Sequence, residues 1–370
     1  MKIFLTILLC SVIIKIIWVI IFRVRTEKKD VLERADYLIS KLTTSPKQLL
    51  SEFPKSIGAQ FQGEWAIYSC SMTCKALTNI GKPCYKEQIA KIIKIAMSKE
   101  IRKYDTERWY EDPFKGLDGN LSHLSYYSHL AWMIGEYKSV YNDNQFDFLY
   151  HSLCKAMYKR ISNSSILNIP TYPQEPIYIP DMLVAIVALN IYNKLYDGKY
   201  QDLINKWMNK AKTEWIDKET GLLVSYIKKD GTISSLIRGS YSALNCYYLA
   251  LIDIDFAKQQ YQRLKINFKQ TLPIVGIKEY NKEKCLFGFD IDAGPIIFNL
   301  SPSGTAFAIG IATMVGDYKF QKQLLTIAEI AGSTITFKRK THYLLAHFAL
   351  VGEAIVLAMK THNKNNLITL

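Results

Sequence analysis

Two aspartates, Asp290 and Asp292, lie two residues apart in the segment FDIDAGPIIFNLSPSGTAF, directly before Gly294 and Pro295. Residues two apart in an extended strand face the same side, so both carboxyl groups would converge on one pocket. Mutual repulsion and burial would then raise the pKa of one of them, which would make it an acid at neutral pH. The alternative is a polar turn whose aspartates accept hydrogen bonds from backbone N–H groups. Both interpretations stay open.

Four further residues are candidates for catalysis with this pair. Asp181 follows a proline at a predicted helix start, where an acid either stabilises the helix end or takes part in chemistry. Arg238 precedes a glycine at another helix start, and its guanidinium would hold a carboxylate or phosphate group, or pair with one of the acids. Tyr178 and Tyr126 would serve as a base or as orienting groups. One of the two aspartates would then be the general acid, surrounded by these four side chains.

Polar and aromatic residues in the same loops and helix starts are candidates for substrate binding. They are Glu64, Tyr68, Trp109, Tyr110, His123, Tyr172, Glu175, Asn245 and Cys246. Simpler roles exist for several of them, because a histidine on an apolar face is usually a core residue and a buried thiol is usually inert. An aromatic-lined cleft beside paired carboxylates would suit a sugar.

The seven cysteines give no sign of a metal site or a disulfide framework. Cys70 and Cys74 are spaced to share one helix face, but no CxxC pair and no cysteine–histidine spacing accompanies them. We therefore predict no metal and no cofactor.

Beyond the N-terminus, apolar residues recur at intervals of three and four, which predicts helices. The twelve predicted segments are 29–43, 63–80, 85–104, 119–141, 144–163, 180–195, 200–216, 238–253, 255–271, 302–316, 317–332 and 339–360.

The connections between these helices alternate between short and long. Short joins produce antiparallel helical hairpins, and strict alternation puts all long connections on one face. Six hairpins predict an all-α fold, a closed (α/α)6 toroid in which the helix at 29–43 packs against the last one. The long connections at 222–237 and 277–291 read as small β-hairpins at the rim. The candidate residues fall on this long-loop face, where the N-termini of inner helices would favour carboxylates or an anionic substrate.

Residues 3–22 form an apolar run with one lysine, which matches the length of a transmembrane helix. We therefore expect an N-terminal membrane anchor over 1–26 and a single barrel domain over 27–370. Arg23, Arg25, Lys28 and Lys29 follow the run, so the positive-inside rule places the main domain on the cytoplasmic side of a single-pass membrane protein.

The net charge of +14 raises the question of charged partners. The basic residues are scattered over many predicted helix faces and form no nucleic-acid-binding motif, so we expect no nucleic-acid partner. An anionic membrane surface and a small-molecule substrate are the expected partners. A homo-oligomer is left open.

Several segments together resemble a known group of proteins. They are GEWAIYSCSMTCKALTNI, YIPDMLVAIVAL, TGLLVSY, RGSYSALNCYYLALIDIDFAKQQYQRLK and DIDAGPIIFNLSPSGTAFAIG. Over about residues 60 to 355 the chain resembles bacterial, often membrane-anchored proteins related to the linalool dehydratase/isomerase domain. The resemblance implies an (α/α)6 barrel and cofactor-independent acid–base dehydration and isomerisation of a monoterpene alcohol. It transfers no catalytic residue to this chain.

Three hypotheses follow. The leading one is a lyase or isomerase that acts on an apolar alcohol by general acid–base chemistry. The second is a carbohydrate-active enzyme, a glycoside hydrolase or sugar epimerase, because six-hairpin toroids commonly host such activities. The third is a membrane-anchored protein that binds a lipid or glycan without catalysis. The lining of the central site separates them.

Overall fold

The computed structural model describes residues 2–22, 28–233, 236–282 and 285–362. The chain is mostly helical. The longer helices are α1 (Lys2–Phe22), α2 (Lys28–Leu42), α4 (Ala59–Ile80), α5 (Tyr85–Ala96), α6 (Lys99–Trp109), α7 (Leu124–Tyr141), α8 (Asp147–Asn163), α9 (Ile179–Leu195), α10 (Gln201–Thr213), α11 (Gly239–Ala250), α12 (Ile254–Phe268), α13 (Pro302–Met314), α14 (Tyr318–Gly332) and α15 (Leu350–Lys360). Short helical turns are α3 (Pro46–Ser51), η1 (Lys55–Ile57) and η2 (Leu344–His347).

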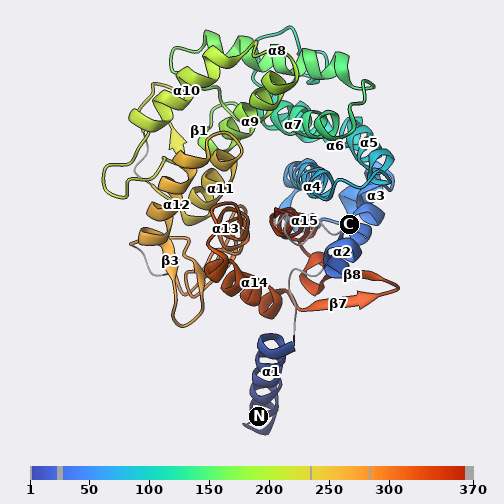
Figure 1. Ribbon diagram of the computed structural model, residues 1–370, viewed down its shortest axis with the longest axis vertical. Coiled ribbons are helices and arrows are strands. Elements are labelled where there is room, and N and C mark those ends of the chain that lie inside the picture. The colour runs from blue at the N-terminus through green and yellow to red at the C-terminus, as the bar shows by residue number, and fades with distance from the viewer. Residues whose placement is uncertain (1, 23–27, 234–235, 283–284, 363–370) are drawn as a thin grey trace.

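Within the described residues, six helices form a closed inner ring in the order α4, α7, α9, α11, α13, α15, and α15 returns to α4 (Figure 1). The helices α2, α5, α6, α8, α10, α12 and α14 lie outside this ring. The architecture is the predicted toroid of helical hairpins, closed by the first and last helices of the barrel.

The inner and outer helices differ in how far they are buried. Nearly every residue of α9 is buried, as expected for a helix enclosed by neighbours on all sides. The outer helix α10 buries one face only and carries lysines on the other. Inner helices also approach closely: a Cβ at Gly310 on α13 would lie 2.2 Å from the Met359 sulfur on α15. A larger residue at position 310 would therefore force the Met359 side chain to move.

Two predicted helices have different bounds. The predicted segment 85–104 is broken in two, because Ser98 begins α6 by accepting a hydrogen bond from the Ile101 N–H at 3.4 Å. The predicted segment 339–360 is helical only in its second half. Its first part belongs to an antiparallel hairpin of β7 (Thr334–Phe337) and β8 (Lys340–Tyr343).

The rim contains strands, with partners that differ from the prediction. Three further antiparallel pairs are β1 (Ile177–Tyr178) with β2 (Tyr226–Ile227), β3 (Lys269–Gln270) with β4 (Gly276–Ile277), and β5 (Phe287–Asp290) with β6 (Gly294–Ile297). Within 222–237, β2 pairs with the loop before α9, and the predicted turn is also present, with an antiparallel bridge between Ile227 and Ile233. The segment 277–291 is divided between two different pairs. Alternation identified strand-forming residues and part of the 222–237 hairpin, but not the pairing of β2 with β1 or the partners of 277–291.

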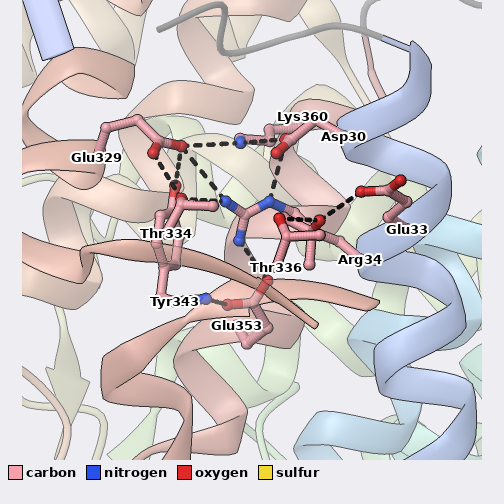
Figure 2. Close-up of polar contacts among 10 residues, drawn as sticks. Asp30, Glu33, Arg34, Glu329, Thr334, Thr336, Tyr343, Glu353 and Lys360 are labelled. Carbon is pink, nitrogen blue, oxygen red and sulfur yellow. Dashed lines mark hydrogen bonds and ion pairs between the residues drawn. The ribbon is translucent and has the colours of Figure 1, made fainter. Parts of the chain in front are cut away.

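The ring closes around a buried network of charged side chains (Figure 2). Arg34 on α2 contacts Asp30 at 3.0 Å, Glu353 at 2.6 Å and Glu329 at 3.4 Å. Lys360 contacts Asp30 at 2.9 Å and Glu329 at 3.5 Å. We call these five residues the ring-closure network. All five are buried, so ion pairs join α2, α14 and α15 where the first and last parts of the barrel meet.

The predicted membrane anchor is not supported. In the described parts of the chain, none of the helices combines the length and apolar character that crossing a bilayer requires. The predictions of a transmembrane helix and of a single-pass membrane location are therefore wrong. Helix α1 contacts α14, and the Lys15 ammonium donates a hydrogen bond to the Ile330 carbonyl at 2.7 Å. Arg23 and Arg25, which set the predicted orientation, lie outside the described residues.

Candidate active site

Three acids from separate parts of the ring interact with one another. Glu64 lies on α4, Asp181 lies in the first turn of α9, and Asp292 lies in the turn between β5 and β6. The charges of Asp292 and Asp181 raise the pKa of Glu64, and the charge of Asp292 raises that of Asp181. We call these three residues the acid cluster. They are candidates for acid–base chemistry because electrostatic coupling of this kind requires proximity.

Glu64 is the acid with the weakest hydrogen bonding. Burial, followed by the charges of Asp292 and Asp181, raises its pKa to about 8, while Arg108 and Tyr172 oppose the increase. Its Oε2 atom is buried and has no hydrogen-bond partner among the described residues. Glu64 is therefore protonated at neutral pH and has a proton to donate.

Asp181 does not cap its helix. The N-cap of α9 is Tyr178, and the Asp181 carboxylate instead accepts a hydrogen bond from the Thr171 hydroxyl at 2.7 Å. Burial raises the pKa of Asp181 to about 7; the Thr171 bond opposes the increase, and the charges of Asp292 and Glu175 add to it. This pKa lets Asp181 both give and take a proton near neutral pH.

The two aspartates of the rim hairpin have different surroundings. The Asp290 Oδ1 atom accepts backbone N–H bonds from Asp292 and Ala293, both at 2.9 Å, and a bond from Arg238 at 2.6 Å. Burial opposes ionisation of Asp290, but the bonds from Ala293 and Arg238 lower its pKa overall. The polar-turn interpretation therefore describes Asp290.

Asp292 is the rim aspartate whose charge acts on Glu64 and Asp181. Burial and the charge of Asp290 raise its pKa, while a 2.6 Å hydrogen bond from the Tyr241 hydroxyl and the charge of Arg238 oppose the increase. Its side chain is 41% exposed, so solvent and small molecules can reach it. Both sequence interpretations thus apply, each to one aspartate.

Arg238 is fully engaged by acids. Its Nε atom donates to Glu279 at 2.5 Å, its Nη2 atom donates to Asp290, and its Nη1 atom lies 3.8 Å from Asp292. Glu279 is buried and also accepts bonds from the Ser240 backbone N–H and hydroxyl. Arg238 therefore holds the rim hairpin in place and offers no free fork to a substrate anion.

Aromatic rings surround the acids. Tyr178, Tyr226 and Tyr241 pack edge to face, with ring centroids 5.2 to 6.2 Å apart. The Tyr178 hydroxyl donates to Glu175 at 3.2 Å, and Glu175 pairs with Arg108 at 2.7 Å. These side chains form one wall of the site.

Two other predicted residues lie beside the acids. The Arg108 guanidinium lies 3.8 Å from the centre of the Tyr172 ring, and Tyr172 influences the pKa of Glu64. Tyr68 lies one turn after Glu64, and its hydroxyl contacts that of Tyr248 at 3.1 Å.

Four predicted residues lie apart from the acids or have partners of their own. Tyr126 is buried, and its hydroxyl donates to the Ala96 carbonyl at 3.0 Å. Tyr110 is 94% exposed at the end of α6. Asn245 is buried and reaches the Val224 carbonyl at 3.5 Å, and burial raises the pKa of the Cys246 thiol.

Trp109 and His123 belong to a separate group. His123 is buried, with Nδ1 2.5 Å from Asp105 and Nε2 3.2 Å from Glu111. The Trp109 ring packs against it with centroids 5.7 Å apart. These residues are absent from the interactions of the acid cluster.

Sequence reasoning missed several residues of this site: Arg108, Thr171, Tyr226, Tyr241 and Glu279. Tyr241 and Glu279 carried a usable signal. Tyr241 follows the quoted RGS motif, and Glu279 is an acid in the predicted rim segment 277–291. The other three are placed by side-chain contacts that no sequence spacing predicts, Thr171 with Asp181, Tyr226 with Arg238, and Arg108 with Glu175.

The comparisons with known proteins establish the fold. No protein-family model matches the chain, and no curated protein matches its sequence. A novel alpha-amylase from Clostridium perfringens superposes with a TM-score of 0.50 at 11% identity, over 80% of this chain and 85% of that one. A family 105 glycoside hydrolase from C. acetobutylicum ATCC 824 superposes with a TM-score of 0.52 at 10% identity, over 91% of this chain and all of that one. These two structural matches give no specific support to the linalool dehydratase/isomerase-like resemblance. The chain has the toroidal helical-hairpin fold of these glycoside hydrolases.

Proposed function

We propose that the protein is a carbohydrate-active enzyme that cleaves a glycosidic bond at the acid cluster. The observation that carries this proposal is that Glu64, Asp181 and Asp292, from three separate segments, lie close enough for their charges to act on one another. Burial raises the pKa of all three, and the Asp292 side chain is still 41% exposed. Glycoside hydrolysis needs one protonated carboxyl group and one ionised carboxylate beside the same bond.

The surroundings of each acid suggest its role. Asp181 would protonate the glycosidic oxygen as its bond to the anomeric carbon breaks. Asp292, whose ionised form is favoured by Tyr241 and Arg238, would accept a proton from the attacking water or bond the anomeric carbon itself. The protonated Glu64 would donate a hydrogen bond to a sugar hydroxyl.

The lining of the site favours a sugar over an apolar alcohol. Glu175 and Arg108 provide polar groups beside the acids, and Tyr178, Tyr226 and Tyr241 provide aromatic surface. Sugars have both hydroxyl groups and apolar C–H faces, which such a mixed lining suits. The fold shared with glycoside hydrolases supports the same choice.

The linalool dehydratase/isomerase-like activity is the second candidate. Protonation of an alcohol oxygen followed by loss of a neighbouring proton also needs an acid and a base, and Asp181 with Asp292 would supply them. The specific observation in its favour is the buried Glu64 Oε2 atom without a partner among the described residues, because an apolar substrate would leave that carboxyl group protonated.

Turnover of chemically defined substrates tests the proposal. Oligosaccharides and aryl glycosides are assayed for bond cleavage, and a monoterpene alcohol is assayed for dehydration. We expect glycoside cleavage, with kcat lowered roughly 10²- to 10⁴-fold in Asp181→Asn and Asp292→Asn, the usual size of a lost acid–base contribution. Asp202→Asn, a highly exposed aspartate on α10, is the matched control.

Three outcomes would reject the proposed function. Cleavage that survives in both variants would remove the catalytic assignment. Dehydration of the alcohol without glycoside cleavage would favour the lyase. Saturable glycan binding without turnover of any substrate would identify a binding protein.

A further inference from the structure

A cavity opens on the long-loop face, and its wall contains none of the acid cluster. Its volume is about 340 Å³, and it lies between the loop that precedes α7 and the end of α8. Its lining includes Trp109, Ser122, Lys159, Arg160, Ile169 and Pro170. We call it the loop cavity. Its size is that of a site for a small molecule.

Arg160 brings a buried positive charge to this cavity. Its side chain is 7% exposed, and no carboxylate of the described residues comes within 4.0 Å of it. Its Nη2 atom donates to the Gly116 carbonyl at 2.6 Å and its Nη1 atom to the Leu117 carbonyl at 3.5 Å. Its Nε atom is buried and has no hydrogen-bond partner there. A buried cation without a counter-ion is unfavourable, so the site favours an anion.

Nearby acids do not take that role. Glu111 and Asp118 act on Arg160 only through their charges at longer range. Glu111 is already in contact with His123 at 3.2 Å. Neither acid belongs to the lining of the loop cavity. The Tyr127 ring lies 5.3 Å from the guanidinium, and both Nη atoms donate to backbone carbonyls, so the Nε atom is the part of Arg160 that remains available to a ligand.

Two neutral donors in the same lining are also unsatisfied. The Trp109 indole N–H and the Ser122 hydroxyl are buried and have no partner among the described residues. Buried donors are normally paired, and three unpaired donors around one cavity indicate a missing acceptor. Lys159 adds an exposed positive charge to the lining.

We propose that the loop cavity binds an oxyanion group, a carboxylate, sulfate or phosphate, either as a free ion or as part of a small sugar derivative. Such a group has acceptors only, so it satisfies the Arg160, Trp109 and Ser122 donors together and neutralises the buried charge. The volume exceeds that of a bare oxyanion and leaves room for a sugar ring. This site is independent of the chemistry proposed for the acid cluster.

Calorimetric titration tests the site. Inorganic sulfate and a hexose phosphate are titrated separately into the full chain at constant ionic strength set with chloride. We expect saturable binding, weakened at least 10-fold in Ser122→Ala combined with Trp109→Phe, since both donors are lost while most of the packing remains. Thr73→Val is the matched control, because it also removes a buried, unpartnered hydroxyl, from α4 and outside the loop cavity.

The relative affinities of the two probes identify the form of the oxyanion. Tighter binding of the hexose phosphate than of sulfate shows that the oxyanion arrives on a sugar, and equal binding shows that a free ion suffices. Absence of saturable binding of both probes up to 10 mM, or equal affinity in the double variant and the parent, overturns the proposal. Thermal unfolding in chloride alone confirms that each variant is folded. Arg160→Lys, which keeps the charge but loses the planar fork, should bind with intermediate affinity.

Discussion

The ring-closure network and the acid cluster both contain aspartates and glutamates, but these acids contact cations in the network and mostly lack them in the acid cluster. In the network, Asp30, Glu329 and Glu353 each contact Arg34 within 3.4 Å. Lys360 reaches two of these acids as well. In the acid cluster, no cation among the described residues lies within 4.0 Å of Glu64 or Asp181. The difference lies in the supply of positive charge and not in the acids themselves.

Because of this difference, the acids of the network have a structural role, whereas those of the acid cluster are candidates for acid–base chemistry. A buried carboxylate that contacts a cation stays ionised and fixes geometry, whereas one without a cation keeps its proton. Helices α2 and α15, which meet at the network, bring both kinds of charge. The loops and helix starts around the acid cluster bring mainly acids and tyrosines. The acid cluster is therefore the region of this ring where protons can be exchanged near neutral pH.

The strongest test of this contrast is removal of the central cation of the network. Arg34→Met leaves three buried acids with Lys360 alone, and loss of one partner of a buried ion pair costs about 3–5 kcal/mol of unfolding free energy. Urea unfolding measures the loss. The control is Lys41→Met on the same helix, whose half-exposed pair with Glu52 should contribute less than about 1 kcal/mol. Equal losses in the two variants would contradict the contrast.

The next effect concerns the pH dependence of stability. The pKa values of Glu64 and Asp181, about 8 and about 7, lie above their ordinary values. Below about pH 3 both groups are protonated in the folded and unfolded chain. As the pH rises, only the unfolded chain releases these protons, so stability falls by up to about 1.4 kcal/mol per pH unit for each group, until the folded pKa is passed.

Amide variants test that assignment. Glu64→Gln and Asp181→Asn should each flatten the decline in stability, up to about pH 8 and about pH 7 respectively, because an amide does not titrate. Unfolding free energies measured across pH 4.5–8.5 provide the comparison, with Asp202→Asn retaining the parent slope. An unchanged slope in both amide variants would show that these acids ionise normally.

A smaller effect should distinguish the two rim aspartates. Asp290→Asn weakens the hydrogen bonds that this side chain accepts from Arg238 and from two backbone N–H groups. We therefore expect the free energy of unfolding to fall by about 1–3 kcal/mol. Asp292→Asn, at a more exposed side chain, should cost less than about 1 kcal/mol. Thermal and urea unfolding at pH 7 rank the pair. The reverse order would reassign the structural role to Asp292.

The smallest effect concerns the hydrogen bond between Tyr241 and Asp292. This bond lowers the pKa of Asp292, so Tyr241→Phe should raise it. The acidic limb of the kcat/KM profile would then move to higher pH, by less than about one unit, with little change on the alkaline side. Tyr110→Phe, at an exposed ring outside the site, should leave the profile unchanged. An acidic limb that stays in place would remove Asp292 as the ionised group.

Helix pattern and connection length predicted the fold, but not the contacts within it. The alternation of short and long joins led to a closed ring with α2 against α15, because periodicity records which face of each helix is buried. The same alternation placed Asp181 and Asp292 on one face of the ring. It could not reveal that Arg238 is occupied by Glu279, or that Asp181 contacts Thr171, since these contacts depend on side-chain directions in space. The apolar run at the N-terminus predicted a transmembrane helix, but no helix of the described residues meets the requirements for one.

The closure of the ring by α2 and α15 also sets the order in which this chain can mature on the ribosome. Asp30 and Lys360 are separated by 330 residues, so at roughly 5–20 residues per second α2 waits roughly 15 to 65 seconds before its partner exists. During that time Arg34 has no Glu329 or Glu353 to contact, and the unclosed edge of α4 lacks α15. Nascent chains therefore expose the unclosed edges of α2 and α4 until α15 has been synthesised.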